Sequence, residues 1–139
     1  MSYAIEDLSP GMSANFVKTV TERDIALFGD VSGDTNPVHF DETFARNTPF
    51  KGRIAHGVLT ASYISTVLGM EMPGPGTIFL GLNIRFKAPV RIGDTVTAVC
   101  TVREVLAERR RVIFDCACTV GDVVVLEGEA TVMPPVRKA

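Results

Sequence analysis

Residues 57–69 read Gly57-Val-Leu-Thr-Ala-Ser-Tyr-Ile-Ser-Thr-Val-Leu-Gly69 and set the architecture of the whole chain. The stretch contains no charged residue, and its apolar side chains recur around most of a helical circumference. A helix of this composition is stable only when it is covered on nearly all sides. We therefore expect one helix that is buried at the centre of the molecule.

The chain that follows alternates apolar and polar residues with a period of two, which is typical of strands with one buried face. This pattern predicts strands over residues 77–87, 95–105, 111–120 and 124–132. In the last of them, Val124 and Leu126 are expected to face the core together. Turn signals such as Gly121-Asp122 separate the segments, and short connections between neighbouring strands indicate an antiparallel meander.

A long antiparallel sheet and a single apolar helix bury their surfaces together when the sheet wraps around the helix. The expected fold class is therefore α+β, with a long antiparallel β-sheet wrapped around a central buried helix. No linker, repeat or low-complexity stretch interrupts the sequence, so we expect one domain over residues 1–139. Upstream, Thr21 and Asp24 resemble a capping box that begins a helix, and Asp41 is placed to cap a shorter one.

The composition excludes several classes of protein. With 46% apolar and 22% charged residues, the chain resembles an ordinary globular domain, not a disordered or coiled-coil protein. The net charge of −2 offers no general attraction to nucleic acid or to a membrane surface, so neither is expected as a partner. Without a run of about 18 apolar residues or a signal-like N-terminus, the protein is expected to be cytoplasmic. Cys100, Cys116 and Cys118 lack metal-ligand spacing and are expected to be reduced, buried thiols.

The first candidate site lies in Asp34-Thr-Asn-Pro-Val-His39-Phe-Asp41. The proline ends the preceding helix and pushes Asn36 out of the α region, so the chain turns and can bring Asp34 and His39 toward a common pocket. A carboxylate and an imidazole placed in this way can serve the two ends of a proton transfer. Alternatively, Asp34 and Asn36 only finish the helix, and His39 pairs with Asp41. A metal site of these side chains lacks supporting ligand spacing, so no metal is expected.

The second candidate site is Ile54-Ala-His56-Gly57, directly before the expected central helix. Glycine allows a ligand to approach the backbone closely, and the first N–H groups of a helix have no partner within it. A helix N-terminus that points into an apolar interior therefore suits a developing oxyanion. The alternative is that Gly57 only caps the helix and that His56 is a loop residue satisfied by the backbone.

Asp34, His39 and the N–H group of Gly57 would together supply a base, an acid and an oxyanion hole. These groups are sufficient to add water across an activated double bond. They also suit hydrolysis, so the spacing alone leaves the reaction open.

These two motifs, with Phe44-Ala45 between them, resemble the hydratase motif of the MaoC-like family, and the pattern is most similar to that of the (R)-specific enoyl-CoA hydratases. The segment Phe86-Lys-Ala-Pro-Val-Arg-Ile-Gly-Asp94 is also similar to this family. The resemblance implies a hot-dog fold and a homodimer whose sheets join edge to edge. It implies a lyase that adds water to an enoyl thioester of coenzyme A, which is then part of the substrate, and no cofactor.

The resemblance implies a role for each site residue. Asp34 is the general base toward a water molecule, and His39 holds this water and helps to deliver its proton to the α-carbon. The N–H group of Gly57 binds the thioester oxygen as enolate character develops. One water supplies both OH and H, which implies syn addition and an (R)-3-hydroxyacyl product. Asn36 either orients the loop through side-chain hydrogen bonds or is a simple turn residue.

The substrate-binding residues that the resemblance implies are less distinctive. Ser65 and Leu68 on the central helix and Val132 on the last strand resemble residues that line the acyl pocket, and plain core packing is the alternative for all three. Lys87 or Arg85 is placed to meet the phosphates of coenzyme A, or is a solvated strand residue.

Three other functions are kept as alternatives. A (3R)-hydroxyacyl-carrier-protein dehydratase of fatty-acid synthesis uses the same chemistry on another carrier, and a basic docking patch would favour it. A hot-dog acyl-CoA thioesterase fits less well, because many of these enzymes carry a carboxylate on or near the central helix and this chain has none from Gly57 through Met70. A non-catalytic acyl-CoA binding module is disfavoured because Asp34 and His39 are both present.

Overall fold

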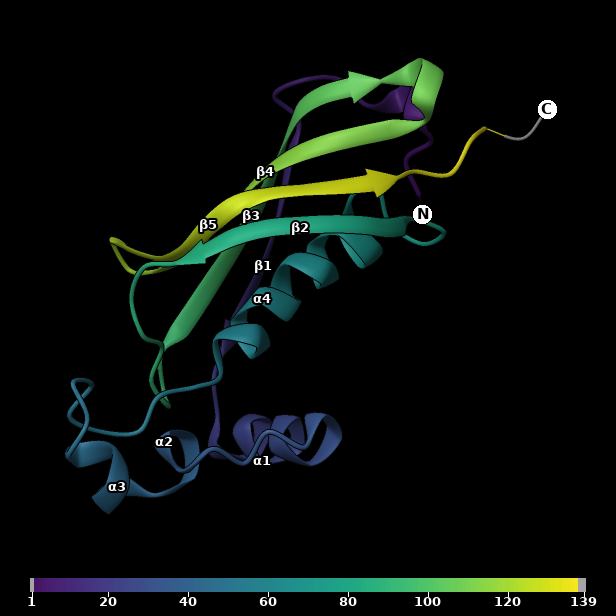
Figure 1. The fold of residues 1–139 in the computed structure, drawn as a ribbon. Helices are drawn as coiled ribbons and strands as arrows, with labels where there is room; N and C mark the ends of the chain where they lie inside the picture. Colours follow the sequence, from purple (N-terminus) through teal and green to yellow (C-terminus); the bar gives the residue numbers. More distant parts are fainter. Residues whose placement is uncertain (1, 138–139) are drawn as a thin grey trace.

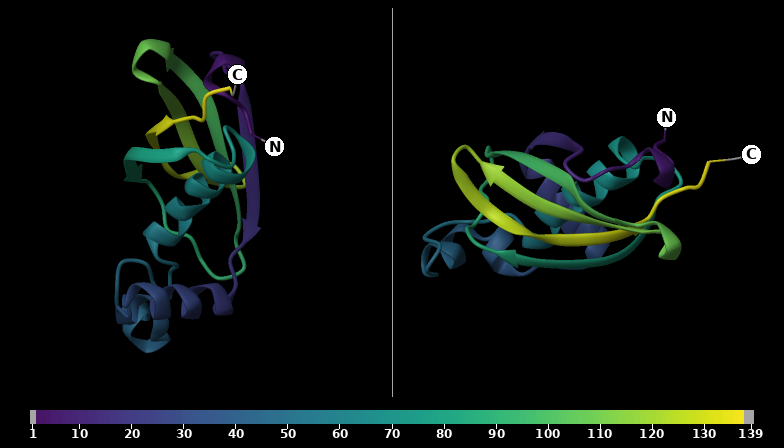
Figure 2. Two further views of the ribbon diagram at one scale, coloured as in Figure 1. Left: turned by 90° about the vertical axis from the view of Figure 1, so that its right-hand side faces the viewer. Right: turned by 90° about the horizontal axis from the view of Figure 1, so that it is seen from above.

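The computed structural model describes residues 2–137, which form one curved sheet around a central helix, with three short helices at one end (Figure 1). Along the chain the elements are η1 (Ile5–Asp7), β1 (Ser13–Thr19), α1 (Glu22–Ser32), α2 (Pro37–Phe40), α3 (Glu42–Arg46), α4 (Gly57–Thr66), η2 (Val67–Glu71), β2 (Ile78–Phe86), β3 (Thr95–Leu106), η3 (Ala107–Arg109), β4 (Arg111–Val120) and β5 (Val123–Met133). The expected α+β arrangement, a long antiparallel sheet wrapped around one helix, is confirmed (Figure 2).

The sheet has five antiparallel strands in the order β1-β3-β4-β5-β2. Strands β3, β4 and β5 are consecutive hairpins, as the sequence predicts, but the expected meander is wrong for β2, which pairs with β5. The segment between β2 and β3 spans residues 87–94 and contains Pro89, so it is too long for a tight hairpin and carries the chain across the sheet. Alternation shows which residues share a face, but it does not show which strands are neighbours.

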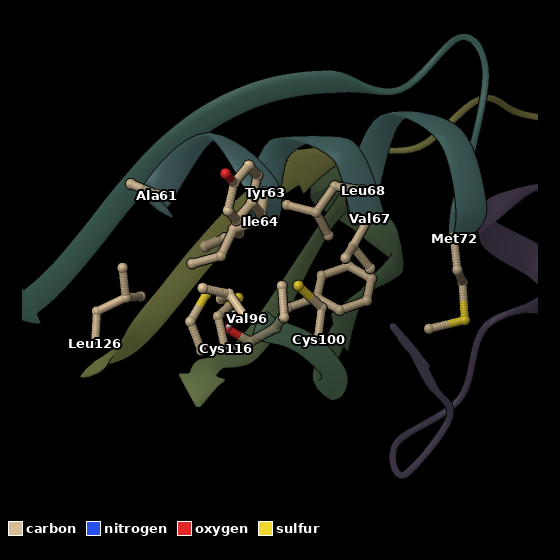
Figure 3. Packing of buried hydrophobic residues seen from close by; sticks show 14 of the residues in the cluster. Ala61, Tyr63, Ile64, Val67, Leu68, Met72, Val96, Cys100, Cys116 and Leu126 are labelled. Atoms are coloured by element: carbon tan, nitrogen blue, oxygen red, sulfur yellow. Dashed lines mark hydrogen bonds between the residues drawn. The ribbon is translucent and has the colours of Figure 1, made fainter. Parts of the chain in front are cut away.

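The core lies between the sheet and the helical segment α4–η2 (Figure 3). Ile64, Val67 and Leu68 of this segment are almost completely buried. They face side chains of the inner sheet surface, of which Phe114 is the largest fully buried one. The alternating apolar residues predicted for β3 and β4 form this surface, and the three cysteines lie within it as free, buried thiols.

A bulge corrects the prediction for the start of β5. Val124 is exposed and Val125 is buried, which is the reverse of the expected pattern. Cys118 pairs with Leu126 whereas Thr119 pairs with Val124, so Val125 is the extra residue of the bulge. One inserted residue reverses the faces because side chains alternate with a period of two.

The central helix is also less covered than its composition indicates. Val58, Ser62 and Ser65 form an exposed stripe along α4, so the expectation of burial on nearly all sides is wrong for the single chain. The stripe arises because the sheet closes over one side of α4 only, and the inner face of the edge strand β2 is exposed as well. The open side of α4 and the edge strand β2 together leave an uncovered apolar region.

The helices α1, α2 and α3 lie beyond the N-terminal end of α4 (Figure 1). The predicted capping box is present: the Asp24 N–H donates to Thr21 Oγ1, and the Thr21 N–H donates to Asp24 Oδ2. Gly33, with φ of 80°, ends α1 in the left-handed conformation that favours glycine. Asp41 caps α3 as expected, because its side chain accepts the N–H of Phe44. Within residues 2–137, none of the helices has the length and apolar character needed to cross a bilayer.

Replacing the fully buried Ile64 by alanine should lower the free energy of unfolding by about 2–5 kcal/mol. The substitution would leave a cavity where the sheet packs against α4. The matched control is Val31→Ala on α1, where the side chain is 83% exposed. This control should change the free energy of unfolding by less than about 0.5 kcal/mol. Urea unfolding followed by circular dichroism measures both values, and equal losses in the two variants would contradict the assigned core.

Candidate active site

Three titratable side chains from separate parts of the chain meet beside the N-terminal end of α4. A carboxylate oxygen of Asp34 and one ring nitrogen each of His39 and His56 lie within 4.8 Å of one another. Asp34 follows α1, His39 lies on α2, and His56 is the residue directly before α4. The turn at Asn36-Pro37 thus brings Asp34 and His39 together, as the sequence predicts.

Hydrogen bonds to the backbone and side chain hold Asp34 in place. Its N–H donates to Ser32 Oγ at 3.1 Å, its carbonyl oxygen accepts His56 Nε2 at 2.9 Å, and its Oδ1 accepts the N–H of Asn36 at 3.2 Å. The side chain is on the exposed surface of the loop, and its Oδ2 makes no hydrogen bond within residues 2–137. One carboxylate oxygen therefore orients the group, and the other is accessible to a water molecule.

The imidazole of His39 is buried, with 7% of the residue exposed. Nδ1 lies 2.8 Å from the carbonyl oxygen of Ile54, and because a carbonyl only accepts, Nδ1 carries the proton. Nε2 of the neutral ring is then a hydrogen-bond acceptor. The alternative pairing of His39 with Asp41 is wrong, since Asp41 caps α3 instead.

Burial lowers the pKa of His39 below its ordinary value of 6.5. The hydrogen bond to Ile54 and the charge of Asp34 oppose this shift, whereas the neighbouring His56 adds to it. At neutral pH the His39 ring is therefore uncharged and can accept a proton. Arg53 also contacts this residue, because its Nε donates to the carbonyl oxygen of His39 at 2.7 Å.

Gly57 is the first residue of α4, where a backbone N–H has no acceptor within the helix. A Cβ atom at this position would lie 2.7 Å from the ring of Phe86, so glycine is needed for this close packing. A cavity of about 430 Å³ opens beside it. Its lining is mainly apolar and consists of Phe50, Ile54, Ala55, Gly57, Val58, Thr60, Phe86, Lys87, Ala88, Pro89, Val90, Val125 and Leu126.

The remaining residues singled out in the sequence are placed as follows. Asn36 begins α2, and its side chain accepts the N–H of Val38 at 3.2 Å. Ser65 lies on the exposed stripe of α4, whereas Leu68 and Val132 are buried in the core, and none of the three lines the cavity beside Gly57. The geometry therefore brings together Asp34, Asn36 and His39, with Gly57 following the neighbouring His56. None of Asp34, Asn36 and His39 lines the cavity beside Gly57, and the acyl-pocket residues lie apart from both in the single chain.

Sequence reasoning did not name Ser32 as a site residue, and it quoted His56 in the second candidate motif without giving it a role in the chemistry. Ser32 ends α1, and a serine two residues before an aspartate is a signal for a local side-chain-to-backbone bond. For His56, the only signal in the sequence was its position directly before the expected central helix. The stacking of His39 on His56, with ring centroids 3.9 Å apart and planes at 28°, depends on tertiary packing.

The same three groups also bear on metal binding. A carboxylate oxygen and imidazole nitrogens are ligand types that a metal ion takes, and one such atom from each side chain lies within 4.8 Å of the others. One nitrogen of each ring already contacts a backbone carbonyl oxygen, so each ring has a single nitrogen left for another partner.

Residues 8–124 match the family model described as "MaoC like domain". The chain belongs to the MaoC-like family. Within it, the chain is 54% identical to the (R)-specific enoyl-CoA hydratase of Rhodospirillum rubrum, over 95% of this chain and 92% of that protein. It is 47% identical to the 3-hydroxybutyryl-CoA dehydratase of Methylorubrum extorquens, over 96% and 85% of the two chains.

A solved structure of the family shows the same fold. The R-hydratase PhaJ1 from Pseudomonas aeruginosa, in its unliganded form, superposes with a TM-score of 0.91 at 40% identity. The match covers 99% of this chain and 89% of that one. The sheet wrapped around α4 is therefore the hot-dog fold of a MaoC-like protein, as the sequence resemblance implies.

A titration of the His39 ring tests the geometry of the site. The pKa of His39 should lie below 6.5, and the signal is assigned by its loss in His39→Gln. Because the unfolded chain then binds more protons than the folded one just below pH 6.5, this group should make the folded protein less stable as the pH falls through that window. Proton–carbon NMR of the imidazoles measures the pKa, and a value above 6.5 would contradict the buried, neutral ring.

Proposed function

We propose that the chain catalyses the reversible addition of water to trans-2-enoyl-CoA, which gives (R)-3-hydroxyacyl-CoA. One observation carries this proposal: two proton acceptors, Asp34 and His39, lie together with His56, the residue directly before Gly57 at the start of α4. The names of the two relatives support it, because a hydratase and a dehydratase act on the same equilibrium from opposite sides. The reaction needs no metal or redox cofactor, since these groups supply both proton steps.

The proposed mechanism follows from the acceptor positions. A water molecule donates its two hydrogens to Asp34 and to Nε2 of His39. As a proton passes to Asp34, the water oxygen bonds to the β-carbon of the enoyl thioester. The electrons of the double bond move toward the carbonyl, and the N–H of Gly57 donates to the enolate oxygen. Asp34 then gives this proton to the α-carbon with the help of His39, the electrons of the enolate form the new C–H bond, and Asp34 returns to its carboxylate form.

The stereochemistry is a consequence of having one water and one pair of groups. Asp34 and His39 lie on the same side of the site, so OH and H reach the same face of the double bond. Syn addition alone allows either configuration at C3, and the name of the (R)-specific relative supports the (R)-3-hydroxy product. Asn36 supports the reaction indirectly, because its side chain orders the start of α2 and its N–H orients the carboxylate of Asp34.

The substrate is expected to enter through the cavity beside Gly57. The apolar wall of the cavity suits the pantetheine arm. Lys87 also lines the cavity, and its side chain is half exposed. Its ion pair with Glu127 is long, at 3.9 Å, so the ammonium group is available to a phosphate. The acyl chain is assigned to the region of Ser65, Leu68 and Val132. Leu68 and Val132 are already in the core, so a long acyl chain requires these side chains to shift.

We also propose that the chain binds a second copy of itself. The edge strand β2 exposes five large apolar side chains, namely Ile78, Phe79, Leu80, Leu82 and Phe86. An exposed apolar edge readily pairs with another strand. The opposite edge, β1, carries mainly polar residues. Antiparallel pairing of β2 with its copy would join the two sheets and cover the exposed stripe of α4, including Ser65.

Hydration of crotonyl-CoA, followed by the loss of enoyl-thioester absorbance, tests the reaction. Asp34→Asn and His39→Ala should each reduce turnover by at least about a hundredfold, because each removes a group that moves a proton. The matched control, Asp30→Asn on the exposed surface of α1, should retain the wild-type rate. Chiral analysis should find the (R)-3-hydroxy product. Thiol release without hydration would point to a thioesterase instead, and hydration of carrier-protein thioesters alone would point to the dehydratase of fatty-acid synthesis.

The dimer is tested by light scattering after size exclusion. Wild type should have twice the mass of one chain, and Leu82→Arg should shift the protein toward the monomer, because the buried charge would oppose pairing of the two β2 strands. Val17→Arg places the same charge on the opposite edge strand, where Val17 is 55% exposed, and should remain dimeric. A monomeric wild type, or equal effects of the two variants, would contradict this interface.

A further inference from the structure

His56 has no role in the chemistry described above, yet it is the most deeply buried member of the cluster. Only 2% of the residue is exposed, compared with 7% for His39, and Asp34 lies on the surface. It is also the member that belongs to the start of the central helix, since it is the N-cap residue of α4. The ring therefore connects the core of the fold to the loop that carries the catalytic groups.

The His56 ring contacts both catalytic residues. Its Nε2 lies 2.9 Å from the carbonyl oxygen of Asp34, and because that oxygen only accepts, Nε2 carries the proton. Its face stacks on the ring of His39, with centroids 3.9 Å apart. One side chain thus fixes the backbone of the base and the ring plane of its partner.

Two phenylalanines fix the plane of His56 in turn. Phe28 of α1 lies with its centroid 4.8 Å from the His56 ring, and Phe40 of α2 lies at 5.7 Å. Phe40 fits under α1 only because residue 29 is glycine, where a Cβ atom would lie 2.6 Å from the Phe40 ring. The direction of the Nε2–H bond is therefore set by rigid packing from two helices.

Packing alone does not explain a histidine at this position. Its Nδ1 is buried and has no hydrogen-bond partner among the residues that the structure describes. A buried nitrogen without a partner destabilises a protein, and a phenylalanine of similar shape would avoid that cost. The property that phenylalanine lacks is the donor at Nε2.

We propose that His56 is a positioning residue for hydration: it acts through Asp34 and His39 and does not itself touch substrate. This inference rests on the function proposed above. The hydrogen bond holds the Asp34 backbone, which otherwise belongs to an exposed loop, and the stacked ring holds His39. Both acceptors then aim at one water. A displacement of about 1 Å at such a site can slow a reaction about a hundredfold.

Two substitutions separate the donor from the ring. His56→Phe keeps the stacking and loses the donor, whereas His56→Gln loses the ring but places an N–H donor near the same point. With crotonyl-CoA, we expect His56→Phe to lower kcat about 10–100-fold with little change in KM. Its unfolding midpoint should be retained or raised, because the unpaired Nδ1 is gone. His56→Gln should recover part of the lost kcat, because it restores the donor to Asp34 but not the ring that stacks on His39.

A second measurement does not depend on activity. The N–H of Asn36 is bonded to the Asp34 carboxylate, so its hydrogen exchange reports the order of the loop. Exchange should be faster in His56→Phe than in wild type and in His56→Gln. If wild type fails to hydrate any enoyl thioester, the proposed function fails, and the exchange comparison still tests the positioning.

Two results would overturn the inference. The first is a folded His56→Phe with the wild-type kcat and unchanged exchange at Asn36. The second is a His56→Gln in which the N–H of Asn36 exchanges as fast as in His56→Phe, because the restored donor would then have no effect on the Asp34 loop. If His56→Phe does not fold, His56→Leu removes the donor within an apolar side chain and carries the same comparison.

Discussion

The burial of α4 by the sheet is the contact on which the rest of the structure depends. On this helical segment, Ile64, Val67 and Leu68 are almost completely buried. They are covered by side chains from strands that are far apart in sequence. This packing fixes the axis of α4, and therefore fixes where its first free N–H groups point. The site is built at this one end because only there does the helix backbone offer unpaired donors.

Once the helix is fixed, short hydrogen bonds assemble the chemistry around it. The chain from α1 to α3 folds back over the start of α4, and polar atoms of Ser32, Asn36 and Ile54 orient the two proton acceptors. Burial keeps His39 uncharged, so it accepts a hydrogen at neutral pH. Asp34 lies on a loop and His39 on the short helix α2, and the contacts of His56 connect both residues to the core.

Much of this was accessible from sequence because it is local. The uncharged run at residues 57–69, the alternation in β3 and β4, and the turn before His39 all follow from periodicity and backbone preference. Three features were not accessible because they depend on tertiary pairing: the bulge that buries Val125, the pairing of β2 with β5, and the stacking of the two histidines. The exposed stripe of α4 departs from the sequence-based expectation for another reason. An apolar pattern shows that a helix face is buried, but it does not show whether the same chain or a second copy buries it.

The central claim is that one water, held between Asp34 and His39, supplies both the hydroxyl group and the hydrogen that add to one face of the double bond. Hydration of crotonyl-CoA in D₂O, with the configuration of the product at C2 and C3 determined by NMR, tests it most directly. The account predicts (R) configuration at C3 and a single deuterium at C2 on the same face as the hydroxyl. Deuterium on the opposite face, or equally on both faces, would contradict it.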